Sequence, residues 1–164
     1  MKPLKRYEMS MISILRNDSR TSLTDISKKT NVPISTLFDR LQGYRKHLVR
    51  RFTILPDFAA LGFHTRATII LKVRREDKDA LRKYLLEHMN VNSLFKINNG
   101  YDFMMDCVFR SILELEDFIS SLEEQFRVKS VSMFYVLEEI AQEKFLITED
   151  VMQAIVQQKH DTAY

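Results

Sequence analysis

Polar side chains that can hydrogen-bond to the bases of duplex DNA cluster between residues 35 and 43. An arginine such as Arg40 can donate two hydrogen bonds to guanine or contact a phosphate, and an aspartate such as Asp39 can accept one from cytosine or orient the adjacent arginine. Leu37, Leu41 and Tyr44 recur among them at the spacing of a buried helix face. If these face inward, a helix presents the others on or near its outer side: Ser35, Thr36, Asp39, Arg40 and Gly43. An ordinary solvated helix face is the alternative interpretation.

Positive charge is concentrated in the same part of the chain. Residues 1–56 contain 12 Lys and Arg but only 4 Asp and Glu, a net charge of +8, whereas residues 57–164 contain 13 and 18, a net charge of −5. A field of this density favours a polyanion, first of all double-stranded DNA. Because clustered flexible cations give affinity without reading bases, we interpret four of them as phosphate contacts: Arg45, Lys46, Arg50 and Arg51.

Residues suited to catalysis or metal binding show no comparable grouping. The four histidines, His47, His64, His88 and His160, lack metal-ligand spacing, and the single cysteine, Cys107, alternates like a buried strand residue. The sequence has no glycine-rich phosphate loop, HExxH motif or serine nucleophile elbow. Uncharged runs reach only about ten residues, too few to span a membrane. We therefore expect a cytoplasmic protein that is not an enzyme, needs no cofactor or metal, and has no membrane partner.

Three short helices are expected to position the basic cluster, in a domain of residues 1–56. The first follows from an apolar stripe at helical spacing, which consists of Tyr7, Met11, Ile14 and Leu15. Ser22 is suited to start the second helix. Pro33 separates the second helix from the third, which Ser35 is expected to cap. Residues 49–55 have a β-like composition and predict a short ribbon that leads out of the domain.

Alternating apolar and polar residues predict strands after a connector of residues 57–64. Four strands are expected, around residues 66–73, 91–98, 101–109 and 131–137, and two helices, around residues 81–88 and 115–122. Their order is strand-helix-strand-strand-helix-strand, the ferredoxin-like arrangement, with an antiparallel sheet covered by helices on one face. The predicted fold class is therefore α+β, with this second domain at residues 65–138.

The second face of the predicted sheet carries apolar side chains where a monomer would present polar ones. Met104 and Val108 in the third strand, and Phe134 and Val136 in the fourth, alternate with core positions. We interpret this face as buried against a second subunit. Alternatively, the C-terminal extension, residues 139–164, folds back over it. A helix is predicted in that extension, with Thr148 as its cap and Val151, Ala154 and Ile155 on one side.

Taken together, these segments resemble the Lrp/AsnC family of transcription regulators. The resemblance covers about residues 5–138 and rests on the order and spacing of several motifs. They are Arg16-Asn17-Asp18-Ser19-Arg20, Leu23-Thr24-Asp25-Ile26-Ser27, Ser35-Thr36-Leu37 with Asp39-Arg40-Leu41, Leu48-Val49-Arg50-Arg51-Phe52, Leu61-Gly62-Phe63 and Asn99-Gly100-Tyr101-Asp102. The resemblance implies a DNA-binding winged helix-turn-helix joined to a ferredoxin-like effector-binding and assembly domain. It also implies a homodimer that often assembles further into tetramers or octamers.

The resemblance implies in addition a site for an amino acid or another small effector between subunits, at residues 98–102. Asp102 is of the type that would hold an α-ammonium group, and the backbone at Gly100 would donate to a carboxylate. The loop is completed by Asn98, Asn99 and Tyr101. The alternative is a tight hairpin in which Asp102 caps the turn.

Two other functions fit parts of the sequence. Sirohaem decarboxylases resemble this two-domain architecture, and Val49-Arg50-Arg51-Phe52 is similar to their Ile-Arg-Arg-Phe-Gly segment. However, their Trp-Pro-Tyr-Asn block is absent, and the chain has no Trp. The other alternative is an effector-binding module that no longer uses DNA, against which the charge of residues 1–56 argues. The chain also departs from the Lrp/AsnC pattern, because Lys46-His47 stand where the family usually has a glycine before its wing.

Overall fold

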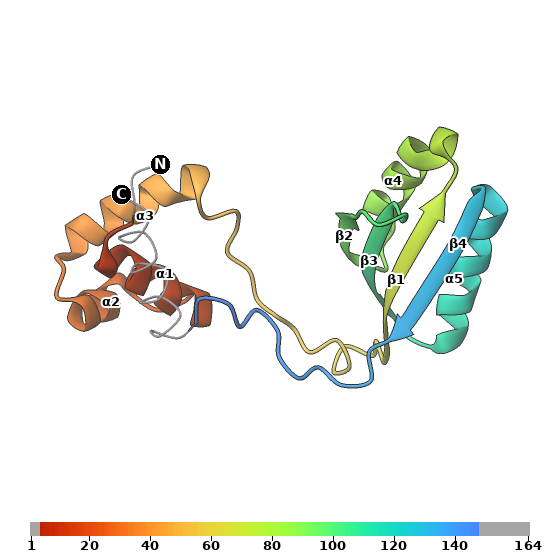
Figure 1. Ribbon diagram of the computed structural model, residues 1–164. Coiled ribbons are helices and arrows are strands. Elements are labelled where there is room, and N and C mark those ends of the chain that lie inside the picture. The colour runs from red at the N-terminus through yellow and green to blue at the C-terminus, as the bar shows by residue number, and fades with distance from the viewer. Residues whose placement is uncertain (1–3, 148–164) are drawn as a thin grey trace. The chain divides into compact units, whose positions relative to one another are not determined.

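The computed structural model describes residues 4–147, which belong to two compact units (Figure 1). The helical unit contains the described residues up to Leu55 and those from Ala141 onward, and the sheet unit spans Pro56–Ile140. The chain therefore passes from the helical unit to the sheet unit and back again. The helix predicted from Thr148, with Val151, Ala154 and Ile155, lies outside the described residues.

The helical unit consists of α1 (Arg6–Asn17), α2 (Leu23–Thr30) and α3 (Ile34–His47). The Ser22 side chain accepts a hydrogen bond from the backbone N–H of Asp25, so it caps α2 as predicted. A short turn, residues 31–33, then joins α2 to α3. The three helices meet on a core of Met11, Ile26, Leu37 and Tyr44.

Two predictions for this unit are wrong. Because α3 begins at Ile34 with Pro33 as its N-cap residue, Ser35 does not cap the helix but lies within its first turn. Residues 49–55 form no ribbon, since no strand is found anywhere from residue 48 to residue 64. Strand N–H and C=O groups need a partner strand, and residues 50–57 are all exposed. A β-like composition is therefore not sufficient to form a strand without a partner strand.

The sheet unit contains four strands that form one antiparallel sheet in the order β2-β3-β1-β4. Along the chain its elements are β1 (Thr65–Val73), a 3-10 turn η1 (Arg75–Asp77), α4 (Lys78–Glu87), β2 (Val91–Lys96), β3 (Phe103–Phe109), α5 (Ile112–Gln125) and β4 (Val128–Tyr135). The protein thus combines helices with a four-stranded antiparallel sheet.

Alternate strand residues build the core of this unit, as side chains along a strand point to opposite faces in turn. The buried set in β1 is the predicted one, Ala67, Ile69, Leu71 and Val73. Residues of β3, α4 and α5 pack against it, so both helices cover the same face of the sheet. Cys107 is fully buried in this core, as expected, and burial raises the pKa of its thiol to about 12.

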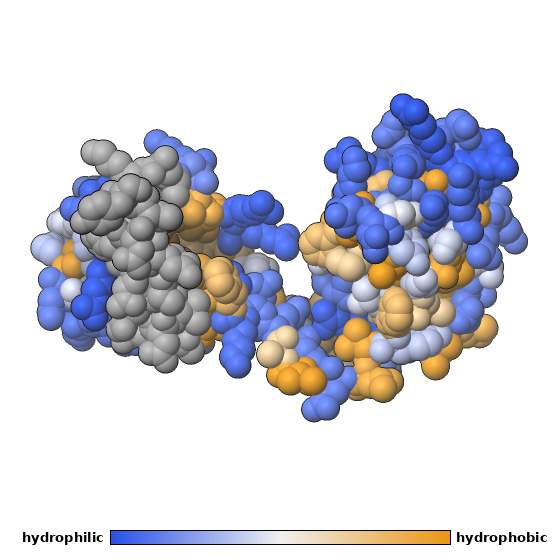
Figure 2. Space-filling view, viewed as in Figure 1, coloured by the Kyte–Doolittle hydropathy of each residue, from blue (hydrophilic) through white to orange (hydrophobic). Residues whose placement is uncertain are grey.

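No helix of the described residues covers the opposite face, which we call the open face of the sheet. The strand register aligns Phe95 with Met104 and Met104 with Ile70, so an apolar row crosses β2, β3 and β1. Phe95 and Phe134 on this face are 49% and 57% exposed. Figure 2 shows hydrophobic side chains mixed with hydrophilic ones on the surface of this unit. The predicted apolar character of this face is therefore present.

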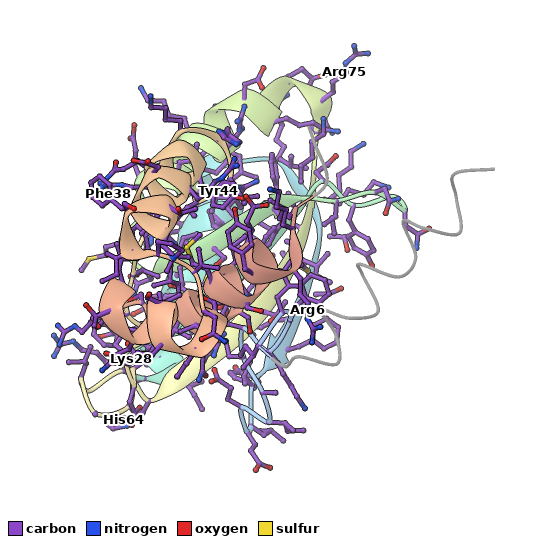
Figure 3. The ribbon with its side chains drawn as sticks, turned by 90° about the vertical axis from the view of Figure 1, so that its left-hand side faces the viewer. Arg6, Lys28, Phe38, Tyr44, His64 and Arg75 are labelled. Atoms are coloured by element: carbon purple, nitrogen blue, oxygen red, sulfur yellow. The ribbon has the colours of Figure 1, made fainter. Side chains whose placement is uncertain are left out.

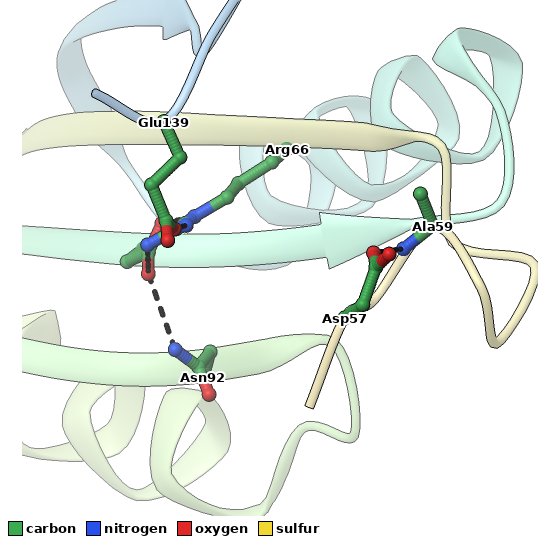
Figure 4. A network of polar contacts seen from close by, with 6 residues as sticks. Asp57, Ala59, Arg66, Asn92 and Glu139 are labelled. Atoms are coloured by element: carbon green, nitrogen blue, oxygen red, sulfur yellow. Dashed lines mark hydrogen bonds and ion pairs between the residues drawn. The ribbon is translucent and has the colours of Figure 1, made fainter. Parts of the chain in front are cut away.

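A polar network interrupts the apolar surface of the open face (Figure 4). The Arg66 guanidinium donates to both oxygens of Asp106, from Nε at 3.0 Å and from Nη2 at 2.8 Å, and its Nη1 pairs with Glu139. Asn92 Nδ2 donates to Asp106 Oδ2 at 3.1 Å. Hydrogen bonding to Asp106 raises the pKa of Arg66. The network joins β1, β2 and β3 to the segment that follows β4.

Residues 141–147 of the C-terminal extension lie against α1. Ser13 Oγ donates to the backbone oxygen of Ile147 at 2.9 Å, and Arg16 Nη2 donates to that of Glu143 at 3.3 Å. Arg16 also pairs with the Glu143 carboxylate and donates from Nε to the backbone oxygen of Phe145. The alternative in which the extension covers the sheet is therefore wrong for residues 141–147, which belong to the helical unit.

Candidate functional site

One side of α3 presents side chains that have no role in the core. Ser35, Phe38, Asp39 and Gln42 follow one another at i, i+3, i+4 and i+7 and are exposed; we call them the outer face of α3. The phenyl ring of Phe38 is 50% exposed (Figure 3). The polar side chains of Ser35, Asp39 and Gln42 make no hydrogen bond or ion pair with any described residue. Within residues 4–147, their donors and acceptors are therefore unpaired.

Most of the predicted DNA-contacting residues lie on or beside this outer face. Thr36 and Gly43 are half-buried at its edge. Apart from the helix's own backbone, a Cβ added at Gly43 would meet no atom of the described residues within 4 Å. The four cations interpreted as phosphate contacts are exposed, in the last turn of α3 and just after it: Arg45, Lys46, Arg50 and Arg51.

Arg40 differs from the other predicted residues because it pairs with α1. Its Nε lies 3.2 Å from Oε1 of Glu8, a carboxylate that is only 5% exposed. Glu8 also accepts from the backbone N–H of Lys5 at 2.6 Å and from the Tyr7 hydroxyl at 3.4 Å. Interactions with Tyr7 and then with Glu8 raise the pKa of Arg40. Burial and a hydrogen bond with Glu8 raise the pKa of Tyr44. Arg40 therefore takes part in the contact between α1 and α3.

Sequence reasoning missed three residues of this region. Phe38 and Gln42 follow from helical spacing, because they lie three and seven residues after Ser35. Glu8 is harder to identify from the sequence, where it is only a carboxylate beside the apolar stripe of α1. Its partner Arg40 lies far along the sequence, so spacing alone cannot pair them.

The predicted effector loop is a tight hairpin between β2 and β3. Asn99 and Gly100 adopt positive φ angles of 57° and 86°, as the turn motif predicts. The backbone N–H of Tyr101 donates to the oxygen of Asn98 at 3.3 Å, and that of Ile97 donates to the oxygen of Asp102 at 3.1 Å. The loop residues are thus brought together as expected.

Asp102 is engaged within the sheet unit. Its Oδ2 accepts from the backbone N–H of Val73 at 3.0 Å, and its Oδ1 pairs with Lys78 Nζ at the start of α4. Burial by itself would raise the pKa of Asp102, but the bonds from Lys78 and Val73 outweigh it and hold the pKa below its ordinary value. The side chain is 14% exposed. This geometry favours the interpretation in which Asp102 anchors the turn.

A shallow hollow of about 260 Å³ lies between the end of α4 and α5. Its polar lining comes from His88, Asn90, Glu114, Asp117 and Ser121. Burial lowers the pKa of His88. Within residues 4–147, no three His, Cys, Asp or Glu side chains are grouped so that they could hold a metal ion. The same part of the chain contains no helix that is long and apolar enough to cross a membrane.

Comparison with known proteins covers most of the chain. Residues 66–145 match the family model of the Lrp/AsnC ligand binding domain. The HTH-type transcriptional regulator FL11 of Pyrococcus horikoshii is 27% identical over 71% of this chain and 78% of its own length. An uncharacterised HTH-type transcriptional regulator of Pyrococcus furiosus is 24% identical over 84% of this chain and 93% of its own length.

Solved structures share the fold. LrpC of B. subtilis superposes with a TM-score of 0.78 at 19% identity and covers 87% of this chain and 99% of its own. A transcriptional regulator of Neisseria meningitidis, solved as a complex with L-Met, superposes with a TM-score of 0.79 at 17% identity and covers 85% and 94%. The domain match, the HTH-type relatives and the shared fold confirm the resemblance found in the sequence. Residues 66–145 thus match the Lrp/AsnC ligand binding domain, and most of the chain is similar to HTH-type transcriptional regulators.

Proposed function

We propose that this regulator binds specific sites in double-stranded DNA by inserting α3 into the major groove, with α2 and α3 acting as a helix-turn-helix. The observation that carries the proposal is the outer face of α3, whose polar side chains have no partner among the described residues. In helix-turn-helix proteins, residues near the start of the second helix contact base edges. Ser35, Asp39 and Gln42 lie in the first turns of α3.

The cations around the end of α3 supply the contacts to phosphate. Arg45, Lys46, Arg50 and Arg51 are exposed, and the first 56 residues carry a net charge of +8. Such contacts add affinity for DNA of any sequence, and this affinity falls as the salt concentration rises. The segment after α3 takes the place of a wing, although residues 49–55 pair with no strand of the described chain.

The protein acts as a two-fold dimer formed through the open face of the ferredoxin-like sheet unit. The apolar row of Phe95, Met104 and Ile70 supports this proposal, because a solvated sheet face carries polar residues instead. A two-fold axis would present two copies of α3 to half-sites about one helical turn apart, or a multiple of it. Assembly of such dimers into tetramers or octamers remains compatible with this geometry.

An amino acid or a similar small molecule is the proposed effector, bound near residues 98–102 between subunits. The Neisseria relative bound to L-Met supports this class of ligand. Because Asp102 is held by Val73 and Lys78, the contacts to the ligand come from its neighbours: Asn98, Asn99, Gly100 and Tyr101. A ligand can regulate only if it prefers one arrangement of the subunits.

Fluorescence anisotropy with the full chain and duplex DNA from its own upstream region tests the proposal. We expect specific binding over random duplex at two salt concentrations, with affinity falling as salt rises. Binding without any preference, or no binding, would contradict it. The absorption spectrum of the protein with sirohaem tests the enzymatic alternative, and we expect no porphyrin complex.

A further inference from the structure

An exposed aromatic ring on the outer face of α3 needs an explanation. Phe38 is 50% exposed, and its neighbour one turn earlier, Ile34, is 45% exposed. Neither packs in the core of the helical unit. A phenyl ring left in water on a helix surface gives up the free energy of its burial, and such apolar patches mark interaction sites. In the major groove, phenylalanine makes apolar contact with the methyl group of thymine.

Gln42 lies one turn after Phe38, on the same face. Its amide carries both donors and an acceptor, and it has no partner within residues 4–147. A glutamine in the major groove can bond to N6 and N7 of adenine together. In homeodomains the recognition helix places its base contacts at i, i+3, i+4 and i+7, which is the spacing of Ser35, Phe38, Asp39 and Gln42.

Arginine usually makes the strongest specific contact to guanine, but the arginine nearest to these residues is held elsewhere. The Arg40 side chain is 50% exposed, and its Nε pairs with the buried Glu8, so its guanidinium is directed toward α1. Arg45 lies near the end of the helix, where contact with phosphate is expected. Phe38 and Gln42 therefore both favour A·T pairs, whereas Asp39, beside Phe38, can accept from cytosine.

We propose that each half-site contains two adjacent A·T pairs read by Phe38 and Gln42, with Phe38 against a thymine methyl and Gln42 on an adenine. Side chains at i and i+4 have Cβ atoms about 5–6 Å apart, and base pairs are stacked about 3.4 Å apart, so the two contacts fall on neighbouring pairs. The inference rests on the proposed DNA-binding function and adds the identity of the bases.

Selection from a random duplex library with the full chain first defines the half-site. Each thymine in it is then replaced by deoxyuridine, which removes only the methyl group. We expect one such change to weaken binding about fourfold for the native chain, the value of one buried methylene-sized group, and to have no effect on Phe38→Ala. Replacing one adenine by 7-deazaadenine should weaken the native chain and leave Gln42→Ala unaffected.

Matched exposed residues of α5 serve as controls. Leu113→Ala and Gln125→Ala should keep the sensitivity of the native chain to both base changes, since α5 belongs to the sheet unit. Circular dichroism checks that Phe38→Ala and Gln42→Ala remain folded. For Gln42→Ala, we expect about 5- to 150-fold weaker binding to the selected site.

The outcomes separate the inference from the function on which it rests. If the library yields no preferred sequence, the proposed function fails. If the native chain selects a site but tolerates deoxyuridine at every thymine, or if Phe38→Ala retains the same sensitivity, Phe38 reads no methyl group. A selected half-site with no adjacent A·T pairs would equally overturn the inference.

Discussion

Arg40 of α3 is paired with Glu8 of α1, with Arg40 Nε 3.2 Å from a carboxylate that is only 5% exposed. Because Glu8 is buried and also accepts from Lys5 and Tyr7, this ion pair joins the two helices and compensates the charge of a buried carboxylate. Sequence reasoning placed Arg40 among base-reading residues. The structure gives it a partner within the helical unit.

Arg40→Ala should therefore lower the melting temperature without changing the base preferences of the protein. The substitution leaves the buried Glu8 carboxylate without its ion pair, and Glu8→Gln in the same chain should recover part of the loss. Lys28→Ala is the control, because Lys28 is 74% exposed and pairs only with Asp25 among the described residues. Thermal unfolding and library selection give the two readouts. Relaxed preference for guanine at one position would instead mean that Arg40 leaves Glu8 to read a base.

Gly43→Ala should stabilise the helical unit by about 0.5–1 kcal/mol, because glycine inside a helix is more costly than alanine. No atom lies within 4 Å of the added Cβ, so no clash offsets the gain. Gly62→Ala is the matched control, since it also meets no atom but has a φ of 86° that alanine adopts only with strain. Denaturant unfolding should show opposite signs for the two variants. A loss of stability in Gly43→Ala would refute the prediction.

Asp102→Asn should destabilise the sheet unit by about 1–3 kcal/mol at neutral pH, because it removes the charge that Lys78 pairs with. The pKa of Asp102 is lower in the folded than in the unfolded chain, so the unfolded chain binds more protons in acid. The stabilisation is thus present above the ordinary pKa of 3.8 and is lost as pH falls through the folded value.

Acid denaturation followed by circular dichroism tests this pH dependence. The native chain should lose stability more steeply below pH 3.8 than Asp102→Asn does. Lys78→Met should also lower the stability at neutral pH, as Asp102→Asn does. Equal stability of Asp102→Asn and the native chain would show that the carboxylate does not anchor the turn.

Met104→Lys should convert the proposed dimer into a monomer of 19.4 kDa. Met104 stands at the centre of the apolar row, aligned with Phe95 on one side and Ile70 on the other. Two lysines facing each other across a two-fold axis would repel each other and lose their hydration. We therefore expect the dissociation constant of the dimer to increase at least tenfold. Sedimentation velocity at micromolar concentration measures it. Leu86→Lys, at a position of α4 where the residue is 63% exposed, should remain dimeric.

Local patterns in the sequence determined much of this protein. Alternation along residues 67–73 identified the buried side of β1, Ser22 identified the start of α2, and Asn99-Gly100 identified the hairpin between β2 and β3. Each of these features depends on a few neighbouring residues, so each can be predicted without the tertiary structure. The order of the motifs was enough to reveal the resemblance to the Lrp/AsnC family.

Only the tertiary structure decided which charged groups meet. Glu8 and Arg40, like Asp102 and Lys78, are far apart in the sequence and are brought together by the packing of separate elements. Residues 49–55 have the composition of a strand but lack a partner for their backbone, and residues 141–147 contact α1 through Ser13 and Arg16. The physical reason is the same in each case. Periodicity encodes the face on which a side chain lies, whereas ion pairs and strand pairing depend on what the rest of the chain places opposite that face.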